Sequence, residues 1–305
     1  PTAKARYHAG FFVHGCSYAA KHMDVRVRRC ASQYDMPELP EVETSRRGIE
    51  PWIVDRRIEG VTVRDRRLRW PVPRGIEGKL RGRTILSVGR RAKYLLINTD
   101  SGTAIVHLGM TGSVFIVDRD TPAGIHDHFD IELDSGKALR FRDPRRFGSF
   151  LFSKRPVEHP LLAKLGPEPL GAAFDGEYLW RKSRGRKVSV KQFIMNAQVV
   201  VGVGNIYASE SLFLAGINPK RAAGRVARQR YELLADAIRD VLSRAIQAGG
   251  TTLRDFYGGD GEPGYFRQQL EVYDREGEHC RTCNTIIKAI VQGQRSTYYC
   301  KTCQT

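Results

Sequence analysis

The chain has 305 residues, of which 41% are hydrophobic, and a formal net charge of +17. This length suffices for two domains of ordinary size, and no apolar run approaches the roughly 18 residues that cross a membrane. A positive surplus of this size favours a polyanionic partner, nucleic acid above all. The basic residues also gather in clusters, at residues 64–69, 90–93, 140–146 and 181–191.

Residues 1–36 are basic, poor in acids and without a sustained helix or strand period. We interpret them as a disordered extension. A targeting arm and a DNA-binding tail stay open, but we favour a start assigned too far upstream, because structural signals begin only at Met36. The extension holds Cys16 and Cys30, and the other four of the six cysteines lie at the far end. No pair is left in the body for a disulfide framework, so we expect a reducing, intracellular setting.

The segment Met36-Pro37-Glu38 carries the most informative chemistry in the sequence. If Met36 is an initiator that is removed, Pro37 has a free secondary amine beside the Glu38 carboxylate. Such an amine attacks a sugar carbon and forms an iminium, with Glu38 as general acid or base. Inside a peptide bond the same nitrogen cannot react, because amide resonance holds its lone pair. The alternative is an ordinary surface glutamate after an internal proline.

A short helix with an acidic first turn is expected over residues 41–49, and short strands rich in Val, Ile, Leu and Phe follow it. Their length and turn residues predict an all-β sandwich or barrel. The predicted strands cover residues 58–64, 85–88, 94–98, 104–107, 113–117, 129–133, 138–142 and 149–152. Residues 165–171 have the composition of a linker. Beyond it, helical spacing covers residues 174–183, 190–195, 206–215 and 228–248.

The tail contains two C-x-x-C pairs, Cys280/Cys283 and Cys300/Cys303, which are separated by 16 residues. Two such pairs at this distance predict a tetrahedral zinc site of four thiolates, and a complete ligand set makes that zinc structural. Arg295 lies between the pairs, on a strand or hairpin tip that would present it to a DNA phosphate. A solvated charge in a turn is the alternative.

Several other segments suit a DNA interface. Lys93 at a strand edge is a compact charge for a phosphate. Met110 and Phe147 lie on tight loops, where they are either core residues or wedges that fill a gap in a DNA stack. Residues 202–206 read as a glycine turn that opens a helix, whose N–H groups and Asn205 side chain would hold a phosphate.

Residues 36–305 resemble the formamidopyrimidine-DNA glycosylase family. The resemblance rests on M-P-E-L-P-E-V-E-T, R-R-A-K-Y, H-L-G-M-x-G, D-P-R-R-F-G, V-G-N-I-Y-A-S-E and the cysteine tail, in this order. It implies an α+β chain in four parts. These are an N-terminal β-sandwich domain at 37–165, a linker at 166–171, a helical domain with a helix–two-turn–helix motif at 172–275, and a C-terminal zinc-ribbon β-hairpin at 276–305.

The resemblance also implies a bifunctional DNA glycosylase and AP lyase of base excision repair, active on 8-oxoguanine and formamidopyrimidines. Pro37 would attack C1′ and form a Schiff base, and Glu38 would donate the proton that helps open the sugar. Lys93 matches a lysine assigned to β-elimination, and Arg295 an arginine assigned to δ-elimination. The implied DNA-contact residues are His126, Arg145, Arg186, Asn205, Met110 and Phe147.

Among these, Met110, Arg145 and Phe147 would enter the void left by a flipped nucleotide, and residues 251–266 would close over the extruded base. Many relatives carry Lys in place of Arg186. The implied cofactor is one structural Zn²⁺. The implied partner is double-stranded DNA with an oxidised purine or an abasic site. The resemblance further implies a monomer that acts in the bacterial cytoplasm and binds no membrane.

Two alternative functions stay open. A non-catalytic, zinc-containing DNA-binding protein follows if Pro37 stays internal. An endonuclease VIII-like glycosylase for oxidised pyrimidines shares the Met-Pro-Glu start, although residues 39–43 and the loop at 145–147 favour purines.

Overall fold

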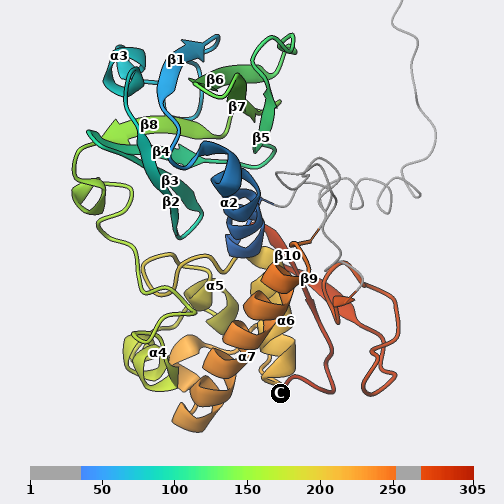
Figure 1. Ribbon diagram of the computed structural model, residues 1–305. Coiled ribbons are helices and arrows are strands. Elements are labelled where there is room, and N and C mark those ends of the chain that lie inside the picture. Colours follow the sequence, from blue (N-terminus) through green and yellow to red (C-terminus); the bar gives the residue numbers. More distant parts are fainter. Residues whose placement is uncertain (1–35, 252–268) are drawn as a thin grey trace, which may run out of the picture. The chain divides into compact units, whose positions relative to one another are not determined.

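The computed structural model describes residues 36–251 and 269–305. Within these ranges a β-sandwich, a group of helices and a two-stranded hairpin follow one another along the chain (Figure 1). This order confirms the predicted α+β class. Residues 1–35 of the predicted extension and residues 252–266 of the predicted base-covering loop lie outside the described residues. No described helix combines the length and the hydropathy that a bilayer crossing requires.

The sandwich consists of two four-stranded antiparallel sheets, with the strand orders β1-β6-β7-β5 and β2-β3-β4-β8. Each predicted strand is present, and its ends differ from the prediction by a few residues at most. The strands are β1 (Ile58–Val63), β2 (Ile85–Arg91), β3 (Tyr94–Thr99), β4 (Gly102–His107), β5 (Ser113–Asp118), β6 (Asp127–Leu133), β7 (Lys137–Arg142) and β8 (Ser149–Ser153).

Aromatic rings join the two sheets. Phe129 of β6 stacks on Phe150 of β8 with ring centroids 3.9 Å apart, and on Phe141 of β7 with centroids 4.9 Å apart. All three rings are fully buried. The short helix α3 (Ile76–Leu80), which the sequence did not predict, contributes Ile76 and Leu80 to the same core.

Helix α2 (Leu39–Ile53) packs against β2 and β5 of the sandwich and against α7 (Arg228–Gln247) of the helical part. The expected end of this helix at residue 49 is wrong, because the helix continues through Pro51. Proline lacks the N–H of one helical hydrogen bond. Ile49 and Ile53 are both fully buried in the sandwich core, and burial stabilises by about 1.5–3 kcal/mol for each such side chain. This packing offsets the lost bond.

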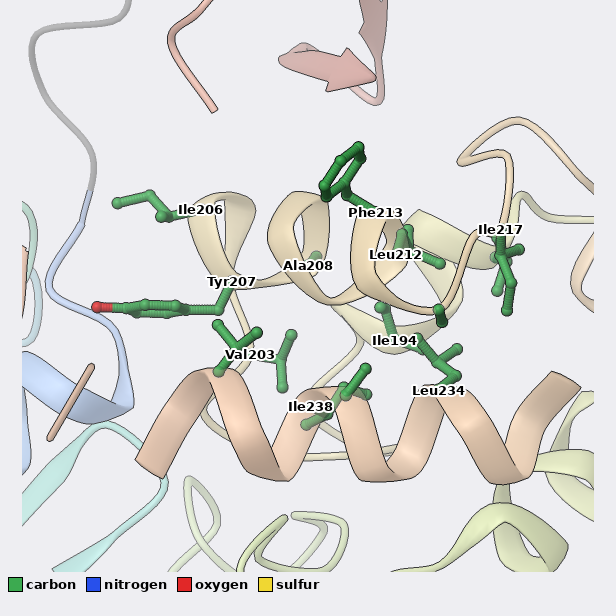
Figure 2. Close-up of a cluster of buried hydrophobic side chains, with 14 of the residues drawn as sticks. Ile194, Val203, Ile206, Tyr207, Ala208, Leu212, Phe213, Ile217, Leu234 and Ile238 are labelled. Atoms are coloured by element: carbon green, nitrogen blue, oxygen red, sulfur yellow. The ribbon is translucent and has the colours of Figure 1, made fainter. Parts of the chain in front are cut away.

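The helical part contains α4 (Gly176–Ser183), α5 (Val190–Ile194), α6 (Asn205–Leu214) and α7 (Arg228–Gln247). Figure 2 shows α6 lying over α7, with Ile194, Leu234 and Ile238 in the space between them. Residues 206–213 of α6 are all buried. Close packing on these buried residues therefore sets where the start of α6, at Gly204, lies.

The C-terminal hairpin pairs β9 (Lys288–Gln292) with β10 (Arg295–Tyr299), and β10 also packs against α6. Gly293 and Gln294 form the two-residue turn, with φ values of 54° and 62°. Two consecutive positive φ values are typical of the tight turns that join hairpin strands. Arg295 is the first residue after this turn, which confirms the expected hairpin position.

Candidate active site and nucleic-acid interface

Pro37 and Glu38 lie immediately before α2 and are both buried. The Glu38 carboxylate reaches the start of α6, where Oε2 accepts a hydrogen bond from the Gly204 N–H at 2.5 Å and Oε1 accepts one from the Ile206 N–H at 2.9 Å. A helix N-terminus stabilises an anion. A Cβ at position 204 would lie 2.3 Å from the Glu38 carboxyl carbon, so only glycine permits this approach.

This arrangement corrects the expectation for residues 202–206. The sequence predicts that the exposed N–H groups of this glycine turn hold a phosphate, but in the structure those of Gly204 and Ile206 hold the Glu38 carboxylate. The reason lies in the packing of α2, whose first N–H, on Leu39, donates to the Gly202 carbonyl at 3.2 Å. Gly202 has a φ of 80° and lies directly against the Leu39 side chain. The glycine turn therefore accepts the start of α2.

A second carboxylate, on Glu41, joins three segments of the chain. It accepts hydrogen bonds from the Glu38 N–H at 2.9 Å, the Tyr207 hydroxyl at 2.6 Å and the Thr251 N–H at 2.9 Å. Burial raises the pKa of Glu41 above its ordinary value, although these hydrogen bonds oppose the rise. The residue beside Pro37 is thus tied to α6 and to Thr251, where the predicted base-covering loop begins.

Lys191 is 1% exposed and ties Asn205 to the hairpin. Its Nζ donates to Asn205 Oδ1 at 2.7 Å and to Thr297 Oγ1 of β10 at 2.9 Å. The Asn205 amide also donates to the Tyr273 hydroxyl at 3.1 Å. An amide nitrogen carries two N–H groups, so a second one remains to donate to a phosphate. Lys191 therefore connects Asn205 to β10, the strand that begins at the exposed Arg295.

Lys93 lies in the turn between β2 and β3, and the linker residue Glu168 anchors that turn. The Glu168 carboxylate accepts hydrogen bonds from the Arg90 and Arg91 guanidinium groups and from the Ala92 N–H, each at 2.8 Å. Burial raises the pKa of Glu168, but Arg90 and the hydrogen bonds outweigh it, so the net pKa is lowered. Glu168 is therefore more than a linker residue, because it fixes the turn that presents Lys93.

His107, at the end of β4 and beside Lys93, was not among the predicted site residues. Its Nδ1 accepts a hydrogen bond from the Gly109 N–H at 2.9 Å, and its ring lies 4.8 Å from that of Tyr94. Burial lowers the pKa of His107 to about 4, and the charges of Lys93 and Arg69 act in the same direction. The neutral ring carries its proton on Nε2, because Nδ1 is the acceptor. The sequence did hold a signal for His107, because it directly precedes the loop of Leu108, Gly109 and Met110.

The two predicted wedge loops are in contact. Met110 is half-buried on the loop after β4, while Arg145 and Phe147 are exposed on the loop after β7. The Arg145 guanidinium carbon lies 4.9 Å from the centre of the Phe147 ring. A Cβ at Gly109 would lie 2.4 Å from the Phe147 carbonyl carbon, so the backbones of the two loops touch.

The predicted site residues therefore fall into two contact groups. The first comprises Pro37 and Glu38 with the start of α6, where Lys191 connects Asn205 to the strand that begins at Arg295. The second comprises Met110, His126, Arg145 and Phe147 on the two wedge loops and the segment before β6. Lys93 lies in the β2–β3 turn beside His107. His126 joins the second group because its carbonyl accepts a hydrogen bond from the Asp143 N–H at 3.0 Å. Arg186 is exposed after α4, and its described backbone bonds, to Ser183 and Gly224, link it to neither group.

The four cysteine sulfurs of the tail lie within 4.8 Å of one another. The Sγ atoms of Cys280 and Cys303 are 3.9 Å apart, and those of Cys283 and Cys300 are 3.4 Å apart. Zn–S bonds of about 2.3 Å in a tetrahedron require S···S separations of about 3.8 Å. One zinc ion fits this cluster and leaves no ligand position for a substrate. Cys280 and Cys300 also belong to the core around α6, so the metal braces the hairpin against that helix.

The basic clusters of the sequence are partly neutralised inside the protein. Arg140 is 2% exposed and pairs with Asp130 at 2.8 Å, and Lys191 is similarly buried. Arg90 pairs with Glu43 at 3.1 Å. Fewer of these cations face solvent than their clustering suggested, because the groups that pair with them come from other segments of the chain.

Three family models match consecutive parts of the chain. The formamidopyrimidine-DNA glycosylase N-terminal domain matches residues 36–150, the H2TH domain of the same glycosylase matches residues 165–257, and a zinc finger found in FPG and IleRS matches residues 277–305.

Curated relatives cover the same region. The chain is 60% identical over 269 residues to formamidopyrimidine-DNA glycosylase from Stutzerimonas stutzeri (strain A1501), and 58% identical over 269 residues to that of Pseudomonas aeruginosa (strain LESB58). Each match covers 88% of this chain and 100% of the relative.

Solved structures have the same fold. The MutM (Fpg) protein from Thermus thermophilus is 36% identical, with a TM-score of 0.79 over 88% of this chain and 98% of that one. A complex between Lactococcus lactis Fpg and an abasic site containing DNA is 32% identical, with a TM-score of 0.81 over 88% and 99% of the two chains. A mutant of the same Lactococcus lactis protein, bound to Fapy-dG containing DNA, has a TM-score of 0.82 at 32% identity and covers 88% and 100%.

Proposed function

Because the chain belongs to the formamidopyrimidine-DNA glycosylase family, we propose that Pro37 and Glu38 carry the chemistry of a bifunctional DNA glycosylase and AP lyase. The protein excises oxidised purines from double-stranded DNA and cuts the strand at the abasic site. Solved relatives bind DNA with Fapy-dG or with an abasic site, which are a substrate and an intermediate of this reaction. The observation that carries the proposal is the Glu38 carboxylate, fixed beside Pro37 by the start of α6.

The active form begins at Pro37. The curated relatives are matched over their whole length by 269 residues, which is 36 fewer than this chain has, and the match to the N-terminal family domain begins at residue 36. With Pro37 first, its nitrogen is a secondary amine and a nucleophile. With any residue in front, the same nitrogen is an amide and does not react. The chain is therefore active when Pro37 is its first residue and inactive when any residue precedes Pro37.

The reaction then follows from the two adjacent groups. The Pro37 nitrogen attacks C1′ and forms an N–C bond, while the electrons of the glycosidic bond leave with the base. Glu38, held as an anion by α6, takes the proton that the amine loses. Glu38 returns that proton to O4′ as the sugar ring opens, and the nitrogen lone pair completes an iminium with C1′. Lys93, to which the resemblance assigns β-elimination, then takes a C2′ proton from this iminium as the C3′–O bond breaks and the 3′ phosphate leaves. A second elimination, assigned to Arg295, passes a C4′ proton to water as the C5′–O bond breaks and the 5′ phosphate leaves.

The surrounding groups hold the DNA. Lys93, Arg295 and the outward N–H of Asn205 are donors for backbone phosphates, and the Nε2–H of neutral His107 beside Lys93 is a fourth. The target carbon is inaccessible in a stacked duplex, so the nucleotide must be flipped out at a cost of a few kcal/mol. Met110, Arg145 and Phe147 offset this cost by filling the void. One structural zinc holds the hairpin that carries Arg295. The protein acts as a monomer, on DNA in the bacterial cytoplasm.

The direct test is excision by a chain of residues 37–305 from duplexes that carry one lesion each. We expect base release and strand cleavage with 8-oxoguanine and formamidopyrimidine, and much slower release of thymine glycol. Preferential release of thymine glycol would support the oxidised-pyrimidine alternative instead. Tight lesion binding without any base release would support a non-catalytic DNA-binding protein.

A further inference from the structure

A buried carboxylate, on Asp143, connects the two loops that carry Met110, Arg145 and Phe147. Asp143 is 0% exposed. Its Oδ1 accepts a hydrogen bond from the Thr111 hydroxyl at 2.7 Å, and its Oδ2 accepts one from the Gly148 N–H at 2.8 Å. Thr111 follows Met110, and Gly148 follows Phe147. One side chain is therefore bonded to the residue directly after each of two wedges.

The third wedge is held by the same pair. The Arg145 N–H donates to Asp143 Oδ1 at 3.3 Å and to Thr111 Oγ1 at 3.2 Å. The Thr111 hydroxyl thus receives one hydrogen bond from the second loop and donates another to it. A hydroxyl can do both, whereas a methyl group in its place can do neither.

The Asp143 backbone is anchored to the sandwich. Its N–H donates to the His126 carbonyl at 3.0 Å, and its carbonyl lies 2.7 Å from His128 Nε2 at the start of β6. Further along the same loop, Arg146 has a φ of 57°, and its guanidinium pairs with Asp65 at 3.1 Å. The loop is therefore fixed at its root and in its middle, on either side of Arg145.

Close packing leaves the two loops little room to slide. A Cβ at Gly148 would lie 2.5 Å from the Phe141 ring and 2.7 Å from the His107 carbonyl oxygen. A Cβ at Gly109 would meet the Phe147 backbone in the same way. Backbone in contact with backbone on both sides transmits a displacement of one loop to the other.

We propose that Thr111 and Asp143 are positioning residues that lock the two loops into a single wedge, so that Met110, Arg145 and Phe147 enter the DNA stack together. The inference rests on the proposed function, since it concerns how that function opens the duplex. Without the lock, the two loops must be ordered relative to each other while the stack is opened. Ordering the loops then costs free energy, which reduces the net stabilisation that the wedge gives to the flipped nucleotide.

The test removes one hydroxyl and compares two substrates. Thr111→Val keeps the shape of the side chain but deletes the hydrogen bonds to Asp143, and Thr111→Ser keeps them. Thr103→Val is the matched control, because Thr103 is a buried strand threonine whose hydroxyl bonds Asn98 at 2.9 Å, away from both loops. Each variant is made in the chain of residues 37–305, the proposed active form, which is as long as the 269-residue match to the curated relatives. Thr111→Ala replaces the valine variant if that variant does not fold.

Single-turnover excision of 8-oxoguanine is measured in a fully paired duplex and in the same duplex with the lesion and its neighbours mismatched. We expect Thr111→Val to slow excision about tenfold in the paired duplex, the size of one lost hydrogen bond to a buried charge. The loss should nearly vanish in the mismatched duplex, where flipping costs least. Fluorescence of 2-aminopurine next to the lesion should report slower unstacking. Thr111→Ser and Thr103→Val should match the wild type on both substrates.

Equal slowing of Thr111→Val on the two substrates would overturn the proposal, because it would place the hydroxyl in the chemistry or in general stability. Unchanged excision of the paired duplex would overturn it as well. A wild-type chain that releases no base from either duplex would instead contradict the proposed function itself, so the two failures are distinguishable.

Discussion

Two backbone N–H groups at the start of α6 decide what the Glu38 carboxylate can do. They hold both of its oxygens, so the carboxylate beside Pro37 has one orientation. A third N–H, that of Glu38 itself, is taken by Glu41. At the residue scale the site is therefore built from carboxylates that are positioned by main-chain donors.

Glu38→Gln tests this arrangement. The amide keeps the size of the side chain but places an NH₂ group against one of the two α6 donors and cannot take a proton. We expect single-turnover base excision to fall about 100-fold or more, the lower range for loss of a general acid–base group. Binding of a lesion duplex, measured by fluorescence anisotropy, should persist. Glu50→Gln on the exposed side of the same helix should excise normally; a matching loss there would remove the special role of Glu38.

His107 gives a prediction for pH. Its pKa of about 4 in the folded protein lies below the ordinary value of 6.5, so the unfolded chain binds the proton first as the pH falls. His107 therefore costs no stability above pH 6.5 and lowers stability progressively between pH 6.5 and 4, by up to about 3 kcal/mol.

His107→Asn supplies the comparison, because its Oδ1 can replace Nδ1 as the acceptor for Gly109. Urea unfolding at several pH values should show a smaller acid loss for the variant than for the wild type. Parallel stability curves from about pH 7 down to about pH 4.5 would show that His107 titrates normally in the folded protein.

At the scale of elements, the catalytic groups depend on how the start of α2 meets the start of α6. Gly204→Ala should disrupt this contact, because a Cβ there lies 2.3 Å from the Glu38 carboxyl carbon. We expect excision to fall by at least the factor seen for Glu38→Gln, with a smaller loss of lesion binding. Gly78→Ala in α3 is the control, since a Cβ there meets nothing within 4 Å and alanine favours a helix. Normal excision by Gly204→Ala would mean that Glu38 does not need α6.

The zinc-bound hairpin, β9 and β10, is the second element on which lesion binding depends. Removal of the metal leaves four thiols without a partner and a tail with little core of its own. We expect chelation, verified by metal analysis, to abolish lesion binding and to raise the exposure of β9 and β10 to hydrogen exchange. Zinc restored in equimolar amount should reverse both effects. A demonstrably zinc-free sample that binds DNA as before would remove the structural role of the metal.

The elements themselves could largely be predicted from the sequence, but their contacts could not. The periodic spacing of apolar residues and the positions of turn residues indicated the strands of the sandwich and the longer helices. Helix α3 gave no such signal, since it has only five residues and starts from Gly75 in a left-handed conformation with a φ of 79°. The same limit applied to Lys191, which belonged to a basic cluster in the sequence but is buried against β10, a contact between residues far apart in the chain.

At the scale of the whole molecule, the positive net charge should dominate binding to undamaged DNA. It is +17 for the full chain and, because residues 1–36 contribute +4, it is +13 for residues 37–305. Each phosphate that is neutralised contributes about 0.9 to the slope of log K against log salt. We expect Arg295→Ala to reduce this slope by about one for lesion-containing and undamaged duplexes alike. Arg155→Ala, a similarly exposed arginine that pairs with Glu158, should leave it unchanged. An identical slope for Arg295→Ala would show that Arg295 contacts no phosphate.

The central claim, amine catalysis by Pro37, is tested most directly by borohydride trapping on a duplex that carries 8-oxoguanine, with the intact mass of the adduct. Two chains are compared, one beginning at Pro37 and one with a single glycine in front of it, which converts the amine to an amide. Catalysis by the Pro37 amine predicts a covalent adduct for the first chain, mapped to Pro37, and none for the second. Equal trapping of both chains, or an adduct on another residue, would contradict it.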